Sequence, residues 1–400
     1  MHLWNAFQKR KKRVYLDHAA ATPLRAEVFA LMRPWFLHTG NPSAIHAEGV
    51  VAREAIEASR EELARTLRVR ASEITYTSGG TESNNLALQG VVRALRTAGR
   101  KNNDIEILST KIEHPSILET LRLLEAEGVG VRYVAVDADG QIDRTALRAA
   151  LSEKTALVTF AYANSEIGTV QEVKKLTRIV RKWNTENGKN VMVHLDASQA
   201  PLWLPCQMDM LGVDLMTLDG GKCGGPVGSG VLVHRHTAQL SSVLQGGNQE
   251  SGLRGGTENT PLIIGCTHAI ISAQHTQSER SEKVKRVRER GIELIEGALP
   301  NAVLNGPRNN RIANNINISL PGLDTEFAVI VLDQRGIAAS TKSACGGADS
   351  KGSHVVKELT SDEARARSTV RFTLGEETTE SDMERVAQTM KEHALLMRHH

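Results

Sequence analysis

A single lysine lies in a glycine-rich stretch of the sequence, where its side chain could do chemistry. Lys222 stands in "LDGGKCGGPVGSG" (residues 218–230), and four interpretations can be weighed. A phosphate-binding P-loop requires a glycine five positions before Gly221, where Met216 stands, and Ser or Thr in place of Cys223. The others are a solvated turn, an anion contact, and a lysine that forms a Schiff base with a bulky cofactor. In the last case the glycines would let backbone and cofactor approach closely.

Polar residues that follow other apolar runs extend the possible chemistry. Gly79 and Gly80 form a tight turn after "EITYTS", and Thr81 then opens a helix. Free backbone N–H groups and a hydroxyl at a helix N-terminus form a phosphate site, although an ordinary N-cap by Thr81 gives the same pattern. His114, just before Pro115, is either a surface residue or a ring that lies flat against an aromatic ligand.

Carboxylate and amide side chains follow two further apolar runs. Asp196 comes directly after "VMVHL", where it can pair with a protonated ring nitrogen or cap a helix. Gln199, three residues on, can reach the same ligand. Asn164 and Ser165 follow "ALVTFAYA" and can hydrogen-bond a ligand hydroxyl or carboxylate, or serve only as turn residues.

Each of these signals is weak alone, but together they form the set that one cofactor requires. The set comprises a phosphate cradle, a ring-stacking group, a carboxylate for a pyridinium and a lysine among small residues. It fits pyridoxal phosphate better than a nicotinamide or a nucleotide. Lys222 is then the residue that forms the Schiff base.

Short apolar runs alternate with longer amphipathic ones, and this pattern predicts alternating strands and helices. The predicted helices cover residues 47–67, 81–95, 115–127 and 173–183, and the predicted strands cover 74–77, 105–109, 131–136, 156–160, 191–195 and 230–234. The alternation predicts an α/β fold with a mainly parallel sheet sandwiched by helices. Ligands collect beyond the carboxyl ends of parallel strands, where the polar residues above would lie.

The pattern of apolar and charged residues changes after about Pro261. A long charged helix, about 263–299, leads to a mixed region that ends in a helix over 381–398. We therefore predict a large cofactor-binding domain over residues 14–262. A smaller α+β domain would cover residues 263–400, together with residues 1–13.

The composition is that of an ordinary soluble enzyme of 400 residues, with 40% hydrophobic and 24% charged residues. The formal net charge of +3 is nearly balanced, so neither direct nucleic-acid binding nor an anionic membrane is expected. The basic run "KRKKR" (residues 9–13) is interpreted as a solvated arm, or as a contact for an acidic partner. No apolar run follows it, as a secretory signal would require, and no stretch approaches the roughly 20 apolar residues of a membrane span.

Four cysteines, Cys206, Cys223, Cys266 and Cys345, are far apart and form no Cys-x-x-Cys pair. A structural zinc site is therefore not expected, and we predict no metal. Free thiols favour a reducing cytoplasm, where at least one of them could be a nucleophile.

Over nearly its whole length the chain resembles the cysteine desulfurases, class V aminotransferase-like enzymes of pyridoxal-phosphate fold type I. The motifs that carry the resemblance occur in the family's order. They are "YLDHAAATPL", "GNPSAIH", "TSGGTESNNLA", "EHPSI", "NSEIGTVQ", "HLDASQA", "GGNQESGLRGGTEN", "STKSAC" and "RFTLGEETTE".

The resemblance implies roles for the residues that would hold the cofactor. Lys222 would attach it, and His114 would stack on its ring. Asp196 would keep the ring nitrogen protonated, and Gln199 would contact the ring hydroxyl. Lys222 and His114 would also move protons during the reaction.

The phosphate would be held from two chains. The resemblance implies that Gly80 and Thr81 bind it within one subunit. It also implies that Thr257 reaches it from the neighbouring subunit of a homodimer.

The resemblance further implies that L-cysteine is the substrate, with its carboxylate held by Arg371 and by Asn164 or Ser165. Cys345 would attack the substrate sulfur as a thiolate, leaving L-alanine and a persulfide. Our own inference is that Lys342 is a local cation for this thiolate. The glycines in "GGADSKGSH" after Cys345 predict a mobile loop that carries sulfur to an acceptor. The alternative for Cys345 is a buried structural thiol.

The sequence departs from the family at three places. Asp219-Gly220-Gly221-Lys222 stands where the family usually has Ser-x-His-Lys, so two phosphate ligands are lost together. A carboxylate repels a phosphate dianion, so either Asp219 turns away, or a cation lies between, or cofactor affinity is weak. Val227 replaces a frequent lysine, and Glu376 replaces an arginine, which we expect to alter a structural ion pair more than chemistry.

Three functions remain open. The first is a cysteine desulfurase that supplies persulfide sulfur to an iron–sulfur scaffold protein or to tRNA thiolation. The second is a relative that acts on selenocysteine or cysteine sulfinate, for which Cys345 matters less. The third is a catalytically impaired scaffold protein of the same fold, which Asp219 and Gly221 favour and the retained Lys222 and Asp196 oppose.

Overall fold

The computed structural model describes residues 13–341 and 352–397, which form two units. The large unit consists of Ala21–Asn164 and Val170–Gln277, and the small unit consists of Met1–Ala20, Ser165–Thr169 and Ser278–His400. The predicted boundary after residue 262 falls inside helix α9 (Thr260–His275), whereas the two units divide after Gln277. Residues 14–20, which we assigned to the larger domain, group with the small unit.

The large unit is built on a seven-stranded sheet in the order β2-β8-β7-β6-β5-β3-β4. Its strands are β2 (Ile74–Thr77), β3 (Glu106–Ser109), β4 (Gly130–Tyr133), β5 (Thr155–Ala161), β6 (Met192–Asp196), β7 (Leu215–Asp219) and β8 (Gly230–His234). All neighbouring pairs are parallel except those of β8, which is antiparallel to both β2 and β7. The carboxyl ends of the other six strands therefore share one edge, as the mainly parallel prediction requires.

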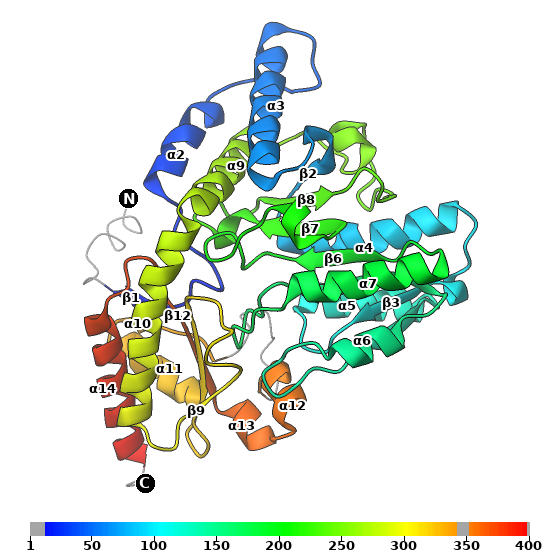
Figure 1. The fold of residues 1–400 in the computed structure, drawn as a ribbon. Coiled ribbons are helices and arrows are strands. Elements are labelled where there is room, and N and C mark those ends of the chain that lie inside the picture. Colours follow the sequence, from blue (N-terminus) through cyan, green and yellow to red (C-terminus); the bar gives the residue numbers. More distant parts are fainter. Residues whose placement is uncertain (1–12, 342–351, 398–400) are drawn as a thin grey trace. The chain divides into compact units, whose positions relative to one another are not determined.

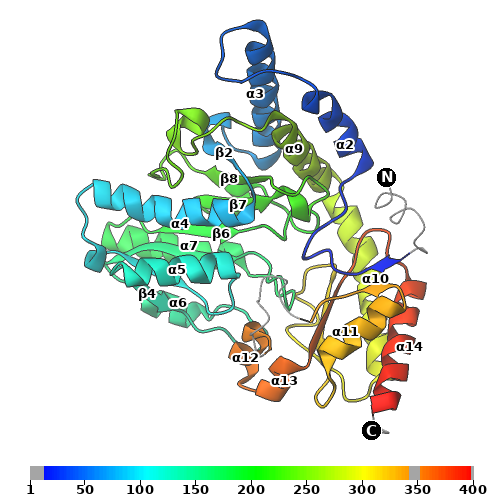
Figure 2. The same ribbon diagram turned by 180° about the vertical axis from the view of Figure 1, so that it is seen from behind.

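Helices cover both faces of this sheet, which confirms the predicted layers. Helices α4 (Gly80–Thr97) and α5 (Pro115–Ala126) lie on one face, and α7 (Val173–Asn187) lies on the other (Figures 1 and 2). The buried residues of α7 include Val173, Leu176 and Val180, the i, i+3, i+7 spacing of one helical stripe. The central strands are buried along almost their whole length, as expected for a parallel sheet that is covered on both sides.

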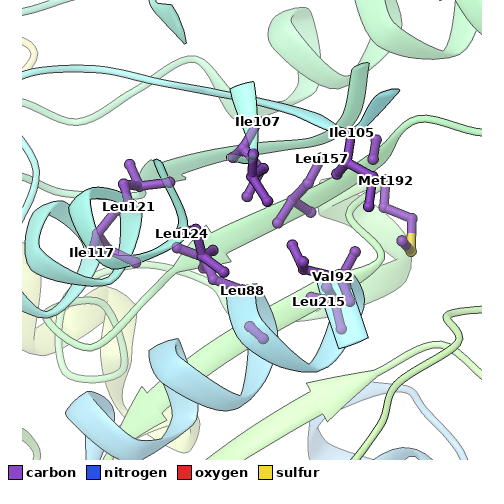
Figure 3. Close-up of a cluster of buried hydrophobic side chains, with 14 of the residues drawn as sticks. Leu88, Val92, Ile105, Ile107, Ile117, Leu121, Leu124, Leu157, Met192 and Leu215 are labelled. Carbon is purple, nitrogen blue, oxygen red and sulfur yellow. The ribbon is translucent and has the colours of Figure 1, made fainter. Parts of the chain in front are cut away.

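A cluster of buried side chains joins α4 and α5 to the sheet (Figure 3). Leu88 and Val92 of α4, Leu121 of α5, and Ile107 and Leu157 of the strands are each fully or almost fully buried. Burial of an aliphatic side chain of this size contributes about 1.5–3 kcal/mol. This cluster fixes the start of α4 relative to the strand ends, where the predicted ligand residues lie.

The remaining helices of the large unit are α2 (Ala26–Met32), α3 (Ala47–Leu67), α6 (Arg144–Ala150), α8 (Met208–Leu211) and α9. Both α2 and α3 pack against α9. The predicted single helix over about 263–299 is wrong, because Thr276 leaves helical geometry (φ −111°, ψ 15°) between α9 and α10 (Gln277–Ala298).

The small unit contains an antiparallel sheet in the order β12-β10-β9 and a parallel pair of β1 with β11. Its strands are β1 (Val14–Tyr15), β9 (Val303–Leu304), β10 (Asn315–Ser319), β11 (Ile337–Ala338) and β12 (Thr369–Thr373). Its helices are α10, α11 (Thr325–Gln334), α12 (His354–Thr360), α13 (Glu363–Arg367) and α14 (Glu380–Met397). Within the described ranges, no helix is both long enough and apolar enough to cross a membrane.

Candidate functional site

The predicted cofactor residues of the large unit lie where its strands end or begin. Asp196 ends β6, and Asp219 ends the adjacent strand β7, three residues before Lys222. Gly230, the first residue of β8, pairs with Asp219 on one side and with Thr77 on the other. The turn that opens α4 follows directly after β2, so these segments meet at one edge of the sheet.

Asp196 is buried, and both of its carboxylate oxygens accept hydrogen bonds. Its Oδ2 accepts from the Asn84 amide at 2.9 Å. Its Oδ1 accepts from the Ser198 backbone N–H at 3.0 Å and from the Ser198 hydroxyl at 2.6 Å. The Asn84 amide also donates to the Ser116 hydroxyl at 2.9 Å, which ties the carboxylate to the start of α5. These bonds orient Asp196 for a further donor such as a ring N–H.

His114 is half-buried and caps helix α5. Its Nδ1 accepts the Ser116 backbone N–H at 3.1 Å and lies 2.8 Å from the Ser116 hydroxyl. An Nδ1 that accepts a backbone N–H leaves the proton of the neutral imidazole on Nε2. The ring is therefore fixed both in place and in tautomer.

Glu113, next to His114, is a buried acid near the candidate site that sequence reasoning missed. It is fully buried, and its two oxygens lie 2.5 Å from the Thr110 hydroxyl and 2.8 Å from the Ala161 backbone nitrogen. Burial, with a smaller contribution from the negative charge of Asp196, raises the pKa of Glu113 to about 8. Glu113 is therefore mostly protonated at neutral pH. Its position beside a strand-end histidine in "EHPSI" was the available signal.

Asn164 and Gln199 also lie in the large unit after strands. The buried Asn164 amide donates to the Ile112 carbonyl at 2.8 Å and so anchors the loop that leads to His114. Gln199 is half-buried in the turn after β6.

Lys222 is half-buried in a short 3-10 turn, Gly220–Lys222, that follows β7. A Cβ at Gly220 would lie 2.4 Å from the Ser229 hydroxyl and 2.9 Å from the Cys266 sulfur, so only glycine fits there. The glycine at this position is thus required by the packing of the chain against itself. The expectation that the glycines leave room for a cofactor stays a prediction.

Asp219 does not turn away from helix α4. Its Oδ2 accepts the Gly80 backbone N–H at 3.0 Å, and its Oδ1 accepts the Gly221 N–H at 2.9 Å. Of the three alternatives weighed for Asp219, the first is therefore wrong. Thr81, the next residue of α4, is exposed.

Arg371 lies in the small unit, in the middle of β12, and is almost fully buried. Its guanidinium donates to Asp17 Oδ1 at 2.9 Å and to the Ser165 carbonyl at 3.1 Å. Its Nε is buried and has no partner among the described residues. An oriented cation with one unsatisfied N–H is suited to an incoming carboxylate. Asp17, which orients it, was not predicted.

The remaining predicted residues are less informative. Thr257 is exposed in the segment that precedes α9. Cys345 and Lys342 lie outside the described residues. Glu376, where the family usually has arginine, pairs with the buried Arg280 at 3.1 Å. That the replacement affects an ion pair more than the chemistry stays a prediction.

The sequence model of the class-V aminotransferase family matches residues 14–386. The chain belongs to this family. It is 38% identical over 374 residues to a protein named cysteine desulfurase IscS from Dictyoglomus turgidum, covering 93% of this chain and 92% of the relative. It is 35% identical over 384 residues to the protein of the same name from Methanosarcina thermophila, with coverage of 95% and 92%.

Solved structures agree with this assignment. A NifS-like protein superposes with a TM-score of 0.88 at 31% identity, covering 96% of this chain and all (100%) of that one. A structure described as SspA in complex with cysteine has a TM-score of 0.77 at 32% identity, with coverage of 91% and 99%. The chain is a pyridoxal-phosphate-dependent enzyme of the cysteine desulfurase group, with the fold that the sequence predicted.

The residues around the proposed cofactor site suit the ring of the cofactor better than they suit its phosphate. The oriented carboxylate of Asp196, the fixed ring of His114 and the amine of Lys222 fit a pyridine ring that carries an aldehyde. The first N–H of α4 fits a phosphate, but the Asp219 carboxylate already accepts its hydrogen bond. The residues therefore fit the cofactor, with one group that competes for its phosphate position.

Proposed function

We propose that the protein releases the sulfur of L-cysteine as a persulfide on Cys345 and leaves L-alanine. One observation carries most of this proposal. The hydrogen-bonded Asp196 ends one strand and Lys222 follows the adjacent parallel strand, in a chain that is 38% identical to a named cysteine desulfurase.

Residues of the large unit would hold the cofactor and move protons. Pyridoxal phosphate, when bound, supplies the electron sink that lets bonds at the substrate Cα break. Asp196 would accept the ring N–H, Gln199 would contact the ring hydroxyl, and His114 would face the ring. The amine of Lys222 would take up the proton that leaves the substrate Cα.

Cys345 would act as the nucleophile on the substrate sulfur. A bond forms between the two sulfurs while the substrate carbon–sulfur bond breaks. The electron pair of that broken bond stays on carbon, and protonation there gives L-alanine. Arg371 is proposed to bind the substrate carboxylate, which its buried and unsatisfied Nε supports. Asn164 is a second proposed ligand.

Alanine production from L-cysteine tests this proposal directly. We expect Cys345→Ala to lower the rate at least 100-fold, while Cys206→Ala, which changes a buried free thiol, keeps it within about twofold. Full alanine production by Cys345→Ala would sink the persulfide route and favour action on selenocysteine or cysteine sulfinate. A protein that stays colourless with added cofactor would favour the impaired scaffold.

We further propose that the protein is a homodimer in which Thr257 serves the neighbouring site. Strongly exposed apolar residues support a partner surface, among them Leu37, 86% exposed, and Ile45, 96% exposed. Mixing Lys222→Ala with Thr257→Ala chains tests both ideas. If Thr257 acts across the interface, one site of each mixed dimer is intact, so a mixed dimer keeps roughly half of the wild-type activity and a freely assorted equal mixture about a quarter. If Thr257 acts within its own chain, no rescue occurs.

The persulfide is proposed to pass to a sulfur acceptor or an iron–sulfur scaffold protein in a reducing cytoplasm. The buried free thiols of Cys206, Cys223 and Cys266 support a reducing setting. Transfer of labelled sulfur from the loaded protein to a thiol-bearing acceptor protein would be the measurement.

A further inference from the structure

The start of helix α4 is the position proposed for the cofactor phosphate. Helix N-termini carry unpaired N–H groups and a partial positive charge, so they attract phosphates and carboxylates. In this protein the Gly80 N–H at that position donates to Asp219 Oδ2 at 3.0 Å. The anion that occupies the helix start is a side chain of the protein itself.

The Asp219 carboxylate is held there from two directions. Its second oxygen accepts the Gly221 N–H at 2.9 Å, and the Asp219 backbone is paired with Gly230 in the sheet. A Cβ placed on Gly80 would lie 2.8 Å from the Ser198 hydroxyl and 3.1 Å from Asp219 Oδ2. The helix start, the turn after β6 and the end of β7 therefore converge on this carboxylate.

A phosphate at the same place would meet two obstacles. The Gly80 N–H can serve the phosphate only if the Asp219 carboxylate gives up its hydrogen bond. A phosphate dianion beside an ionised carboxylate is also repelled by it, and the effect is strong where water is partly excluded. The unphosphorylated aldehyde, pyridoxal, meets neither obstacle.

We propose that Asp219 is a built-in anion that competes with the cofactor phosphate for the start of helix α4, so that the phosphate adds little to cofactor affinity. The proposal rests on the proposed function for the location of the ring beside Lys222. It assigns Asp219 as the residue that sets the preference between phosphorylated and unphosphorylated cofactor.

The first experiment compares dissociation constants of pyridoxal phosphate and pyridoxal by absorbance, with borohydride trapping at Lys222 followed by mass spectrometry. We expect the wild-type protein to bind the two within about fivefold of each other. Asp219→Asn, which keeps the size of the side chain and removes its charge, should strengthen pyridoxal phosphate binding at least tenfold and leave pyridoxal within twofold. Asp219→Ser is the second variant, in case the amide perturbs folding.

The second experiment needs no cofactor. Inorganic phosphate is titrated into the apo protein while the melting temperature is followed. Asp219→Asn and Asp219→Ser should show a saturable rise that the wild type lacks. Asp143→Asn is the matched control, because Asp143 is an exposed carboxylate that accepts the Thr145 and Ala146 N–H groups at 2.7 and 3.1 Å at the start of α6.

The outcomes separate this proposal from the proposed function. If the variants change neither the preference between the two aldehydes nor the response to inorganic phosphate, the competing role of Asp219 is wrong. If no variant traps either aldehyde at Lys222, the proposed function fails instead. The phosphate titration then still decides whether Asp219 fills the anion position.

Discussion

Asn84 connects the Asp196 carboxylate to helices α4 and α5. Its amide donates to Asp196 on one side and to Ser116 on the other, from a position that is 1% exposed. Its own Oδ1 is buried and has no partner among the described residues. The two hydrogen bonds that its amide donates therefore hold the Asn84 side chain in place, while its oxygen stays unsatisfied.

Asn84→Ala should therefore loosen Asp196. Removing the amide leaves a buried carboxylate oxygen and a buried hydroxyl without their donor, which costs about 1–3 kcal/mol of stability. We also expect weaker cofactor binding, because Asp196 loses its orientation. Urea unfolding and a cofactor titration measure the two effects. Gln89→Ala is the control on the same helix, because its amide donates to the neighbouring Asn85 side chain and not to Asp196. Equal behaviour of the two variants would contradict this role.

Sequence reasoning proposed residues that would touch the ligand, but it did not find the residues that hold those side chains in place. Asp196 and His114 were visible because each follows a predicted strand, and Lys222 because it stands alone in a glycine-rich stretch. Asn84 was not visible, because an asparagine inside "TESNNLA" could face solvent as easily as the sheet. Which face of the helix points to the sheet is decided by packing. Asp17 could not be assigned to Arg371, because the two are 354 residues apart in the sequence.

At the scale of elements, the position of β8 between β2 and β7 decides how closely the turn before α4 approaches the sheet. A Cβ at Gly230 would lie 2.6 Å from the Cα of Gly79. Gly79 itself has φ +148°, a conformation that favours glycine. The strand and the turn are thus in contact through two residues without side chains.

Gly230→Ala should push this turn away from the strand end. Overpacking of this kind costs about 1–3 kcal/mol, whereas cofactor affinity should change little, because the Gly80 N–H is already bonded to Asp219. Thermal unfolding and cofactor titration are the measurements. Gly297→Ala is the control, because nothing lies within 4 Å of a Cβ there and alanine favours a helix. A Gly230→Ala protein with wild-type stability would show that the turn can yield freely.

The elements themselves were largely predictable, and the exceptions have physical causes. Helix α3 and strands β2 and β8 have the predicted bounds, because their periodicity is clear and turn residues flank them. Strand β7 was not predicted, since "LMTLD" is a short apolar run of a kind that occurs equally in a buried helix. The break at Thr276 was missed because charged residues continue the helical pattern on its far side.

At the scale of the whole molecule, one buried acid makes stability depend on pH. The ordinary pKa of 4.5 for glutamate is raised to about 8 at Glu113 by burial and by Asp196. Between these values the unfolded chain has released the proton and the folded protein retains it. Stability from this group is therefore present at low pH and falls as pH rises, by roughly 1.4 kcal/mol per pH unit, until it levels off above the folded pKa.

Glu113→Gln should remove this dependence, because glutamine imitates the protonated acid. The difference in unfolding free energy between variant and wild type should grow in favour of the variant from pH 5 to pH 8. The variant is compared with the wild type because His194 also makes stability depend on pH. Burial lowers the pKa of His194 to about 4, so its contribution to stability rises with pH between that value and its ordinary pKa of 6.5. Glu119→Gln, at an exposed position, should give a flat difference. A flat difference for Glu113→Gln would mean that Glu113 is ionised in the folded protein.

The division into units has a consequence for protein engineering. The backbone passes from one unit to the other after Ala20, Asn164, Thr169 and Gln277. No single cut yields two continuous gene fragments that each encode one unit, and a truncation after residue 262 would end within the first turn of α9. Split-protein or domain-exchange experiments on this enzyme should therefore join at Gln277 and leave Ser165–Thr169 in place. That short passage and Met1–Ala20 are the parts of the small unit that a fragment ending at Gln277 would still carry.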